Sequence, residues 1–241
     1  GYLGRYREAI AHYGAMLEAF VDEPRLLRHR GHRYLTVREI DSAVADFERA
    51  AALIEGKPDR VEEDGLPNAR NQPTSTLGTN IYYHLGLAHF VLGDFAQARK
   101  AYEACLELSK NPDMEAATRH WLHMTLRRLG DDSAADEVLA AVRSDWDIIE
   151  NQSYFKLLLL ARGELTVEQV LETDGEAPAQ AAIIFGVAMI IVNNAMVTAT
   201  LDRTAEIGTM RAIGAQRTTV IALFVTETLL IGLLAGVAGM V

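Results

Sequence analysis

The stretch from Asn80 to Asp113, NIYYHLGLAHFVLGDFAQARKAYEACLELSKNPD, decides the fold of this 241-residue chain. Gly86 and Ala98 are small residues, as two helices in close contact require. Gly93 and Asp94 between them suit a tight turn. The stretch therefore predicts an antiparallel helical hairpin. Larger side chains are expected to fill the space beside the close approach, namely Tyr82, Leu85 and Tyr102.

The same pattern recurs with a period near 34 residues. Three positions near the N-terminus recur 34 residues later: Ala9, Tyr13 and Met16 correspond to Ala43, Phe47 and Ala50. The second unit also has Gly31 and Tyr34 upstream, and a weaker fourth unit over 116–142 has His123 where glycine is expected. This period is typical of helical-hairpin arrays. The residues resemble the tetratricopeptide repeat family, which implies an all-α array whose first unit has only its second helix.

An insertion separates the second unit from the third. The two are 55 residues apart instead of 34, and the extra residues fall near 56–79, a segment rich in Pro, Gly and Asn. We expect a loop there. Two interpretations stay open: a binding element that covers the concave groove, or a disordered insertion.

The repeat domain is predicted to span 1–174 and to bind a peptide or a protein, because stacked hairpins form an extended concave surface without a catalytic pocket. No cofactor and no enzymatic activity are expected. The whole formal charge of −10 lies before Ala177, and an acidic surface disfavours nucleic acid as a partner. The histidine pairs at 29 and 32 and at 120 and 123 lack the further ligands of a metal site and favour structural roles.

Two apolar runs follow a break near Gly175 and Pro178. Residues 179–201 and 218–241 are each long enough to cross a bilayer, although a buried core helix is an alternative for the first. Polar residues inside membrane helices face neighbouring helices, and Gly-x-x-x-Gly pairs permit close helix contact. The residues concerned are Asn193, Asn194, Glu227, Gly232 and Gly236.

A basic bridge joins the two runs. Its arginines place it in the cytoplasm by the positive-inside rule. Ile207, Met210 and Ile213 are spaced as one narrow apolar stripe of a short helix, which Gly214 can end. Such a helix lies along the membrane or docks in the groove of a partner.

The bridge and its flanks resemble the C-terminal permease region of FtsX and MacB type ABC transporters. The matching residues are Arg203, Glu206, Ile207, Gly208, Arg211, Ala212, Ile213, Gly214, Ala215, Glu227, Gly232 and Gly236. In that family the bridge is a coupling helix on a cytoplasmic ABC-type ATPase. The resemblance implies that Glu206 to Ala215, with Met210, contacts such an ATPase. It also implies a permease dimer and a bacterial inner (cytoplasmic) membrane.

The sequence departs from the family pattern in two ways. The family's membrane span before the extracytoplasmic domain and its last span have no counterpart here, and a helical repeat replaces the usual periplasmic domain. The side of the membrane that holds the repeats therefore stays open. We expect residues 175–241 to be a partial permease segment, from a fragment, a natural fusion or a chimera. The alternative is a soluble protein-interaction scaffold with an incidental tail.

Overall fold

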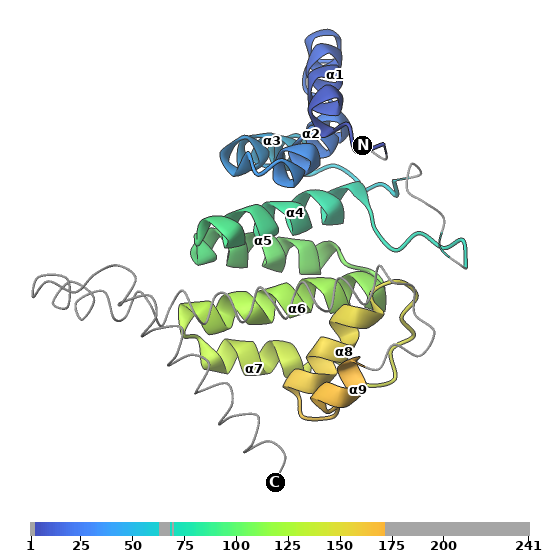
Figure 1. Cartoon of the computed structure of the whole chain (residues 1–241), viewed down its shortest axis with the longest axis vertical. Helices are drawn as coiled ribbons and strands as arrows, with labels where there is room; N and C mark the ends of the chain where they lie inside the picture. Colours follow the sequence, from blue (N-terminus) through green and yellow to red (C-terminus); the bar gives the residue numbers. More distant parts are fainter. Residues whose placement is uncertain (1–2, 63–67, 69, 172–241) are drawn as a thin grey trace, which may run out of the picture. The chain divides into compact units, whose positions relative to one another are not determined.

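The computed structural model describes residues 3–62, 68 and 70–171, and this part of the chain is all-α. Its helices follow one another along the chain, joined by short connections except for two longer segments, 55–76 between α3 and α4 and 141–151 between α7 and α8 (Figure 1). Their bounds are α1 Tyr6–Ala19, α2 Pro24–Thr36, α3 Ile40–Ile54, α4 Leu77–Leu92, α5 Phe95–Leu108, α6 Pro112–Leu129, α7 Asp132–Ala140, α8 Gln152–Ala161 and α9 Val167–Leu171.

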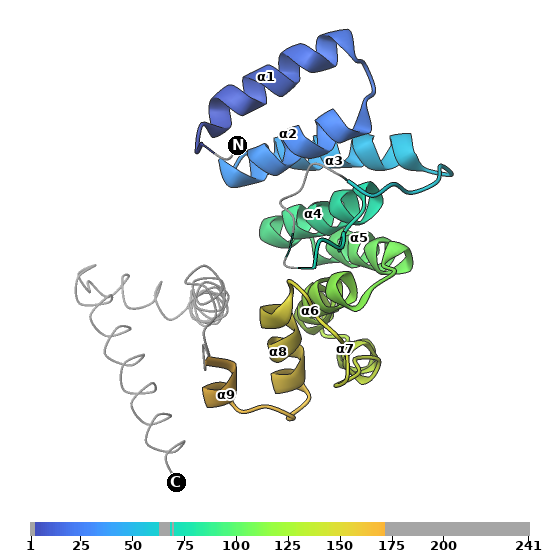
Figure 2. The ribbon, with the colours of Figure 1, turned by 90° about the vertical axis from the view of Figure 1, so that its right-hand side faces the viewer.

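The helices form an array of antiparallel hairpins in two layers. Three hairpins, α2–α3, α4–α5 and α6–α7, stack in sequence order (Figure 2). Helix α2 contacts α4 and α4 contacts α6, whereas no comparable contact joins α3 to α5 or α5 to α7 within the described residues. The helices α2, α4 and α6 are therefore the more closely spaced layer, here called the inner layer. The helices α3, α5 and α7 make up the outer layer.

The hairpin turns have a local chemical cause. Gly93 ends α4 with a φ of 79°, and Asp94 begins α5 by accepting a hydrogen bond from the backbone N–H of Gln97 at 3.2 Å. Gly130 and Asp131 repeat this arrangement between α6 and α7, with a glycine φ of 73°. Only glycine adopts such a φ at little cost, and an aspartate cap satisfies a free helix N–H. The Gly-Asp pairs thus fix where each hairpin turns.

Glycine also sets the spacing of the two helices within a hairpin. A Cβ added at Gly86 would lie 2.6 Å from Tyr102 Cε1, and one added at Gly31 would lie 3.0 Å from Phe47 Cε1. Both rings are fully buried. The hairpins α2–α3 and α4–α5 therefore close on the same pair of residue types, a glycine and an aromatic ring.

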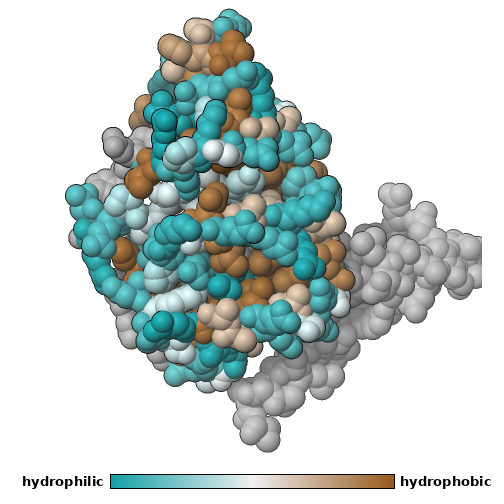
Figure 3. Space-filling view, turned by 180° about the vertical axis from the view of Figure 1, so that it is seen from behind, coloured by the Kyte–Doolittle hydropathy of each residue, from teal (hydrophilic) through white to brown (hydrophobic). Residues whose placement is uncertain are grey.

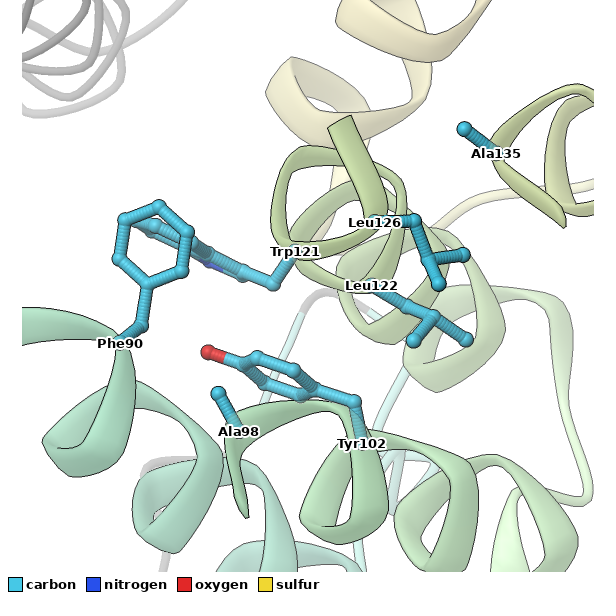
Figure 4. Packing of buried hydrophobic residues seen from close by; sticks show 7 residues of the cluster. All are labelled: Phe90, Ala98, Tyr102, Trp121, Leu122, Leu126 and Ala135. Carbon is cyan, nitrogen blue, oxygen red and sulfur yellow. The ribbon is translucent and has the colours of Figure 1, made fainter. Parts of the chain in front are cut away.

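The core continues between hairpins. Figure 4 shows the cluster that joins α4, α5, α6 and α7, with the Tyr102 hydroxyl pointing toward Phe90 and Trp121. The rings of Phe90 and Trp121 meet edge to face at 5.2 Å, a favoured aromatic geometry. The remaining members of the cluster are Ala98, Leu122, Leu126 and Ala135.

The hairpin α6–α7 has no glycine at the position that Gly31 and Gly86 occupy in the other two hairpins. His123 occupies it, and Leu139 stands sixteen positions later, where the other two hairpins have an aromatic residue. The His123 side chain lies 3.3 Å from the Ala135 carbonyl of α7, so its ring N–H can donate to it. This hydrogen bond gives the larger His123 side chain a partner within the hairpin.

The outer layer presents charged side chains to solvent. Lys100, Glu103 and Glu107 of α5 are all exposed. Seen from behind, the surface shows bands of hydrophilic residues with hydrophobic ones between them (Figure 3). This pattern is typical of amphipathic helices that bury one face.

The chain divides into two units, Gly1–Gly175 and Glu176–Val241, and all the helices above belong to the first. Both predicted membrane spans and the basic bridge between them lie outside the described residues. Among the residues that are described, no helix is both long and apolar enough to cross a membrane.

Candidate protein-binding face

One side of helix α4 is only partly covered by the rest of the described residues. Its residues on this face are spaced by three or four positions and are only partly buried or exposed, unlike the buried residues that face α3 and α5. Such spacing marks a single side of a helix. The residues of this side, here called the open face, are Asn80, Tyr83, His84 and Leu87, which are partly buried, and Val91, which is exposed.

Helix α2 is strongly basic in an acidic protein. It contains Arg25, Arg28, Arg30 and Arg33 and no acidic residue. Arg30 is committed to the hairpin, because its guanidinium makes two hydrogen bonds of 2.7 Å to Asp46 of α3. These hydrogen bonds to Asp46 raise the pKa of Arg30.

Two histidine rings join the open sides of α2 and α4. The rings of His32 and His84 lie 4.4 Å apart. Arg33 donates to His32 Nδ1 at 2.8 Å, whereas His84 Nδ1 donates to the Asn80 carbonyl at 2.6 Å. These partners assign the proton to Nε2 of His32 and to Nδ1 of His84. Burial lowers the pKa of His32 to about 2 and that of His84 to about 4, so both rings are neutral near pH 7.

Arg28 meets a carboxylate that the insertion supplies. Its Nη2 lies 2.6 Å from Glu62 Oε2, and the two side chains are 13% and 5% exposed. Asn80 of α4 also donates to Glu62 Oε2 through its side-chain amide. Glu62 thus lies between α2 and α4 and binds both. A buried ion pair of this kind is stable only when additional hydrogen bonds satisfy its members.

The first part of the insertion is fixed to the start of α4. Asp59 accepts hydrogen bonds from Thr76 Oγ1 at 2.5 Å and from the backbone N–H of Gly78 at 2.9 Å. Val61 pairs with Thr76 as an isolated antiparallel bridge. These contacts hold the residues that precede Glu62.

The later part of the insertion reaches α6 and the segment before α8. Arg70 forms an ion pair with Asp147, and its Nη2 lies 2.7 Å from Asp147 Oδ1. Thr74 donates to Glu150, and the Asn111 side chain donates to the Thr74 carbonyl at 2.9 Å. The described residues of the insertion therefore contact all three inner helices or their flanks.

Asp113 positions the segment that the insertion meets. Its side chain is 2% exposed, and its carboxylate accepts the backbone N–H groups of Ile149, Glu150 and Asn151 at 2.7 to 2.9 Å. Three such bonds fix the turn into α8.

Helix α8 extends the inner layer. The Tyr154 hydroxyl accepts a hydrogen bond of 3.1 Å from Tyr83 of α4, and its ring lies 5.3 Å from that of His120 of α6. Burial lowers the pKa of His120 to about 3, so this ring is neutral. Tyr83, His120 and Tyr154 thus form an aromatic cluster on the inner layer, next to the basic helix α2 along the array.

The remaining histidine and cysteine candidates have structural surroundings. His29 accepts from Arg28 at 2.9 Å and stacks on Tyr13. Cys105 is fully buried beside Thr118, and burial raises the pKa of its thiol to about 11. No group of three or more metal-ligating side chains occurs in the described part of the chain.

The structure places the repeat residues of the sequence at hairpin contacts. Gly31, Ala43, Phe47, Leu85, Gly86, Ala98 and Tyr102 are buried, and Tyr34 and Tyr82 are partly buried. The predicted bridge and membrane-span residues lie outside the described residues. Sequence reasoning missed Arg28, Glu62 and Asp113. The run of four arginines in α2 could have indicated Arg28. No local sequence pattern identifies Glu62 or Asp113.

Comparison with known proteins supports two assignments on this chain. Residues 79–112 match the tetratricopeptide repeat family model. Helices α4 and α5 and their glycine-aspartate turn fall within this match. Residues 79–112 are a tetratricopeptide repeat.

The C-terminal part of the chain matches a second family beside this tetratricopeptide repeat. Residues 180–241 match the FtsX-like permease C-terminal model. Among solved structures, the crystal structure of MamA is similar to this chain, with a TM-score of 0.45 and 15% sequence identity over 80% of this chain and 94% of that one. No curated protein matches the sequence.

Proposed function

We propose that this protein is a membrane-associated scaffold that holds a protein partner on the inner layer of its tetratricopeptide array. The FtsX-like segment would couple the scaffold to an ABC-type ATPase. The observation that carries the proposal is the occurrence of both matches, at 79–112 and 180–241, on one chain.

The inner layer has the properties of a recognition surface. Its open residues on α4 are mainly aromatic, amide and aliphatic, and α2 adds positive charge beside them. Aromatic residues and arginine are the side chains most enriched where proteins bind one another. The outer layer offers exposed charged side chains instead.

The proposed role of the C-terminal segment rests on the FtsX-like match and on the sequence of the bridge. That family consists of membrane permeases, so the match implies association with a membrane. We propose that 179–201 and 218–241 span the bacterial inner membrane and that Ile207, Met210 and Ile213 contact the ATPase. In this arrangement the bridge lies in the cytoplasm, and two copies of the chain form the permease pair.

Site-specific crosslinking tests the scaffold role. A photo-crosslinking amino acid replaces Val91, which is 58% exposed at the end of the open face of α4, and the matched control carries it at the exposed Lys100 of α5. We expect a discrete protein adduct from position 91 in cells and none from position 100. Equal labelling at both positions would argue against a partner on the inner layer.

The same cells test the membrane role. We expect the chain to sediment with membranes and to copurify with an ABC-type ATPase, and the triple alanine variant at 207, 210 and 213 to lose the ATPase while remaining in the membrane. A chain that stays in the supernatant with its adduct intact would favour the alternative, a soluble scaffold with an incidental tail.

A further inference from the structure

A groove opens at the edge of the array where the insertion leaves α3 and returns to α4 (Figure 1). Its volume is about 500 Å³, and it lies between the start of α2, the end of α3, the start of α4 and the end of α5. No residue of the open face of α4 lines it. The groove is therefore a separate place from the inner-layer face described above.

Part of the groove wall is apolar. Ile54 of α3, Leu77 and Tyr82 of α4 and Leu108 of α5 contribute side chains to it. Leu77 is buried, whereas the other three side chains are only partly buried and keep some accessible surface. Such a wall can bind the methylene chain of a long polar side chain while the charged end stays near water.

The charged side chains around the groove are mostly acidic. Six carboxylates and three cationic side chains line it. Four of the carboxylates have recorded partners: Asp22 binds Arg49, Glu23 binds Arg25, Asp59 accepts the backbone N–H of Gly78, and Glu62 binds Arg28. These four are committed to holding the array and the insertion together.

Glu55 and Glu107 are the other two carboxylates. Both are exposed, and neither makes an ion pair or a side-chain hydrogen bond within the described part of the chain. Glu55 follows the last residue of α3 and Glu107 lies in the last turn of α5, where the helix dipole disfavours negative charge. Burial raises the pKa of Tyr82, and the negative charges of Glu55 and Glu107 raise it further. A cation beside this ring would thus offset both charges.

The cationic side chains of the groove do not neutralise this pair. Arg25 is bound to Glu23. Lys57 and Arg60 are exposed, and neither forms an ion pair with Glu55 or Glu107 in the part of the chain that the structure describes. The groove therefore combines an apolar wall with two carboxylates that have room for a cation from outside.

A basic segment of another protein has the complementary chemistry. The methylene chain of a lysine or arginine can pack on the apolar wall, and its charged end can reach the carboxylates and the face of the Tyr82 ring. A second copy of this chain is a poorer match, because its formal charge is −10 and like charges repel across an interface.

We propose that this groove binds a lysine or arginine side chain from a basic segment of the protein partner, with Glu55 and Glu107 as the receiving carboxylates. The existence of a partner rests on the proposed function. The inference adds a second contact for that partner, outside the inner layer, and the charge of the segment that makes it.

Removing the two charges should weaken binding of a basic peptide. The probe is a fluorescein-labelled hexalysine peptide with an amidated C-terminus, and hexaglutamine is the neutral control. Fluorescence anisotropy follows binding to the full chain in a neutral detergent. We expect the double variant Glu55→Gln with Glu107→Gln to bind hexalysine about fivefold more weakly than the unmodified chain, because two exposed ion pairs are lost. The fold should be kept, since both side chains are exposed and stand at helix C-termini.

The matched control is the double variant Glu18→Gln with Glu137→Gln. Both residues are exposed and neither lines the groove, so the control makes the same change in net charge elsewhere. We expect its affinity for hexalysine to stay within about twofold of the unmodified chain, because salt screens distant charges. An equal loss in the two double variants would show that hexalysine responds only to net charge, and the proposal would be wrong.

Crosslinking locates the bound peptide. A hexalysine peptide that carries benzoylphenylalanine at its C-terminus is irradiated with the full chain, and the adducts are mapped by mass spectrometry. We expect adducts within 54–62, 77–82 or 104–108, and their loss in the variant without Glu55 and Glu107. Adducts confined to other parts of the chain would overturn the proposal.

Failure of this inference can be told apart from failure of the proposed function. If the adduct at position 91 forms in cells but the Glu55 and Glu107 double variant binds hexalysine as the unmodified chain does, the scaffold stands and the groove proposal is wrong. If that variant loses hexalysine affinity but no adduct forms at position 91, the basic-segment site stands and the scaffold is wrong. A change in oligomeric state between the unmodified chain and this variant, measured by light scattering, would assign the groove to a second copy and overturn the proposal.

Discussion

The hairpins α2–α3 and α4–α5 share one packing scheme and differ in the chemistry of their open faces. Each closes on a glycine and an aromatic ring sixteen positions apart, Gly31 with Phe47 and Gly86 with Tyr102. Yet α2 carries four arginines, whereas α4 contains no Asp, Glu, Lys or Arg. Residues between the two helices of a hairpin are constrained by packing. Residues on the open face are less constrained, so the repeats can differ there in the partners that they bind.

The turns of the two hairpins differ as well. Arg38 adopts a φ of 64° at the end of α2, in the position that Gly93 occupies at the end of α4 with a φ of 79°. Glu39 makes no side-chain capping hydrogen bond, whereas Asp94 caps α5. The α2–α3 hairpin thus has the more strained turn.

Acidification should weaken the contact between the two hairpins. An unfolded histidine binds a proton below a pH of about 6.5, whereas His84 does so only below about 4 and His32 below about 2 when folded. The unfolded state binds more protons in this window, so stability is fully present above pH 6.5 and is lost as the pH falls. We expect each ring to remove roughly 1 kcal/mol of unfolding free energy per pH unit. Urea unfolding at pH 7, 6 and 5 measures the slope.

Two variants test this assignment. His84→Gln keeps a side-chain donor for the Asn80 carbonyl and cannot titrate, so the slope should decrease by about one proton's share. His12→Gln alters an exposed histidine of α1 and serves as the control. A slope that is the same in His84→Gln as in the unmodified chain would show that the ring is not responsible.

Alanine at the two hairpin glycines should sharpen the comparison. The Gly86→Ala methyl would lie 2.6 to 2.8 Å from three atoms of the buried Tyr102 ring, whereas the Gly31→Ala methyl would lie at 3.0 Å or more from Phe47. Overpacking costs about 1 to 3 kcal/mol, and alanine returns about 1 kcal/mol through helix propensity. We expect a loss of about 2 kcal/mol for Gly86→Ala and a change of less than about 1 kcal/mol for Gly31→Ala. Equal losses in chemical denaturation would contradict this view of the two contacts.

These examples show how far the sequence determines the structure. The hairpins could be predicted because their signals are local: Gly86 and Tyr102 lie one hairpin apart, and Gly93 with Asp94 specifies a turn. The Arg28–Glu62 contact could not, because Glu62 lies in an irregular segment whose path depends on Asp59 and on the start of α4. The repeat pattern of the sequence does not predict where a residue of such an irregular segment lies.

Asp113 illustrates a different limit. An acidic residue in the first turn of a helix is expected from the helix dipole alone, and α6 has both Asp113 and Glu115 there. The sequence does not reveal that Asp113 instead binds three backbone N–H groups beyond α7. The role of this residue comes from long-range contacts.

The smallest predicted effect concerns the two turns. Arg38 is exposed, so Arg38→Gly removes an unfavourable φ without loss of packing. The strain of a left-handed residue is about 1 kcal/mol, and the entropy of glycine in the unfolded chain offsets part of the gain. We therefore expect Arg38→Gly to stabilise the protein by about 0.5 kcal/mol, and Gly93→Ala to destabilise it by about 1 kcal/mol. Thermal unfolding of both variants compares them directly. If Arg38→Gly lowered the melting temperature as much as Gly93→Ala does, the prediction would be wrong. Contacts of the Arg38 side chain would then stabilise the α2–α3 turn by more than its backbone strain destabilises it.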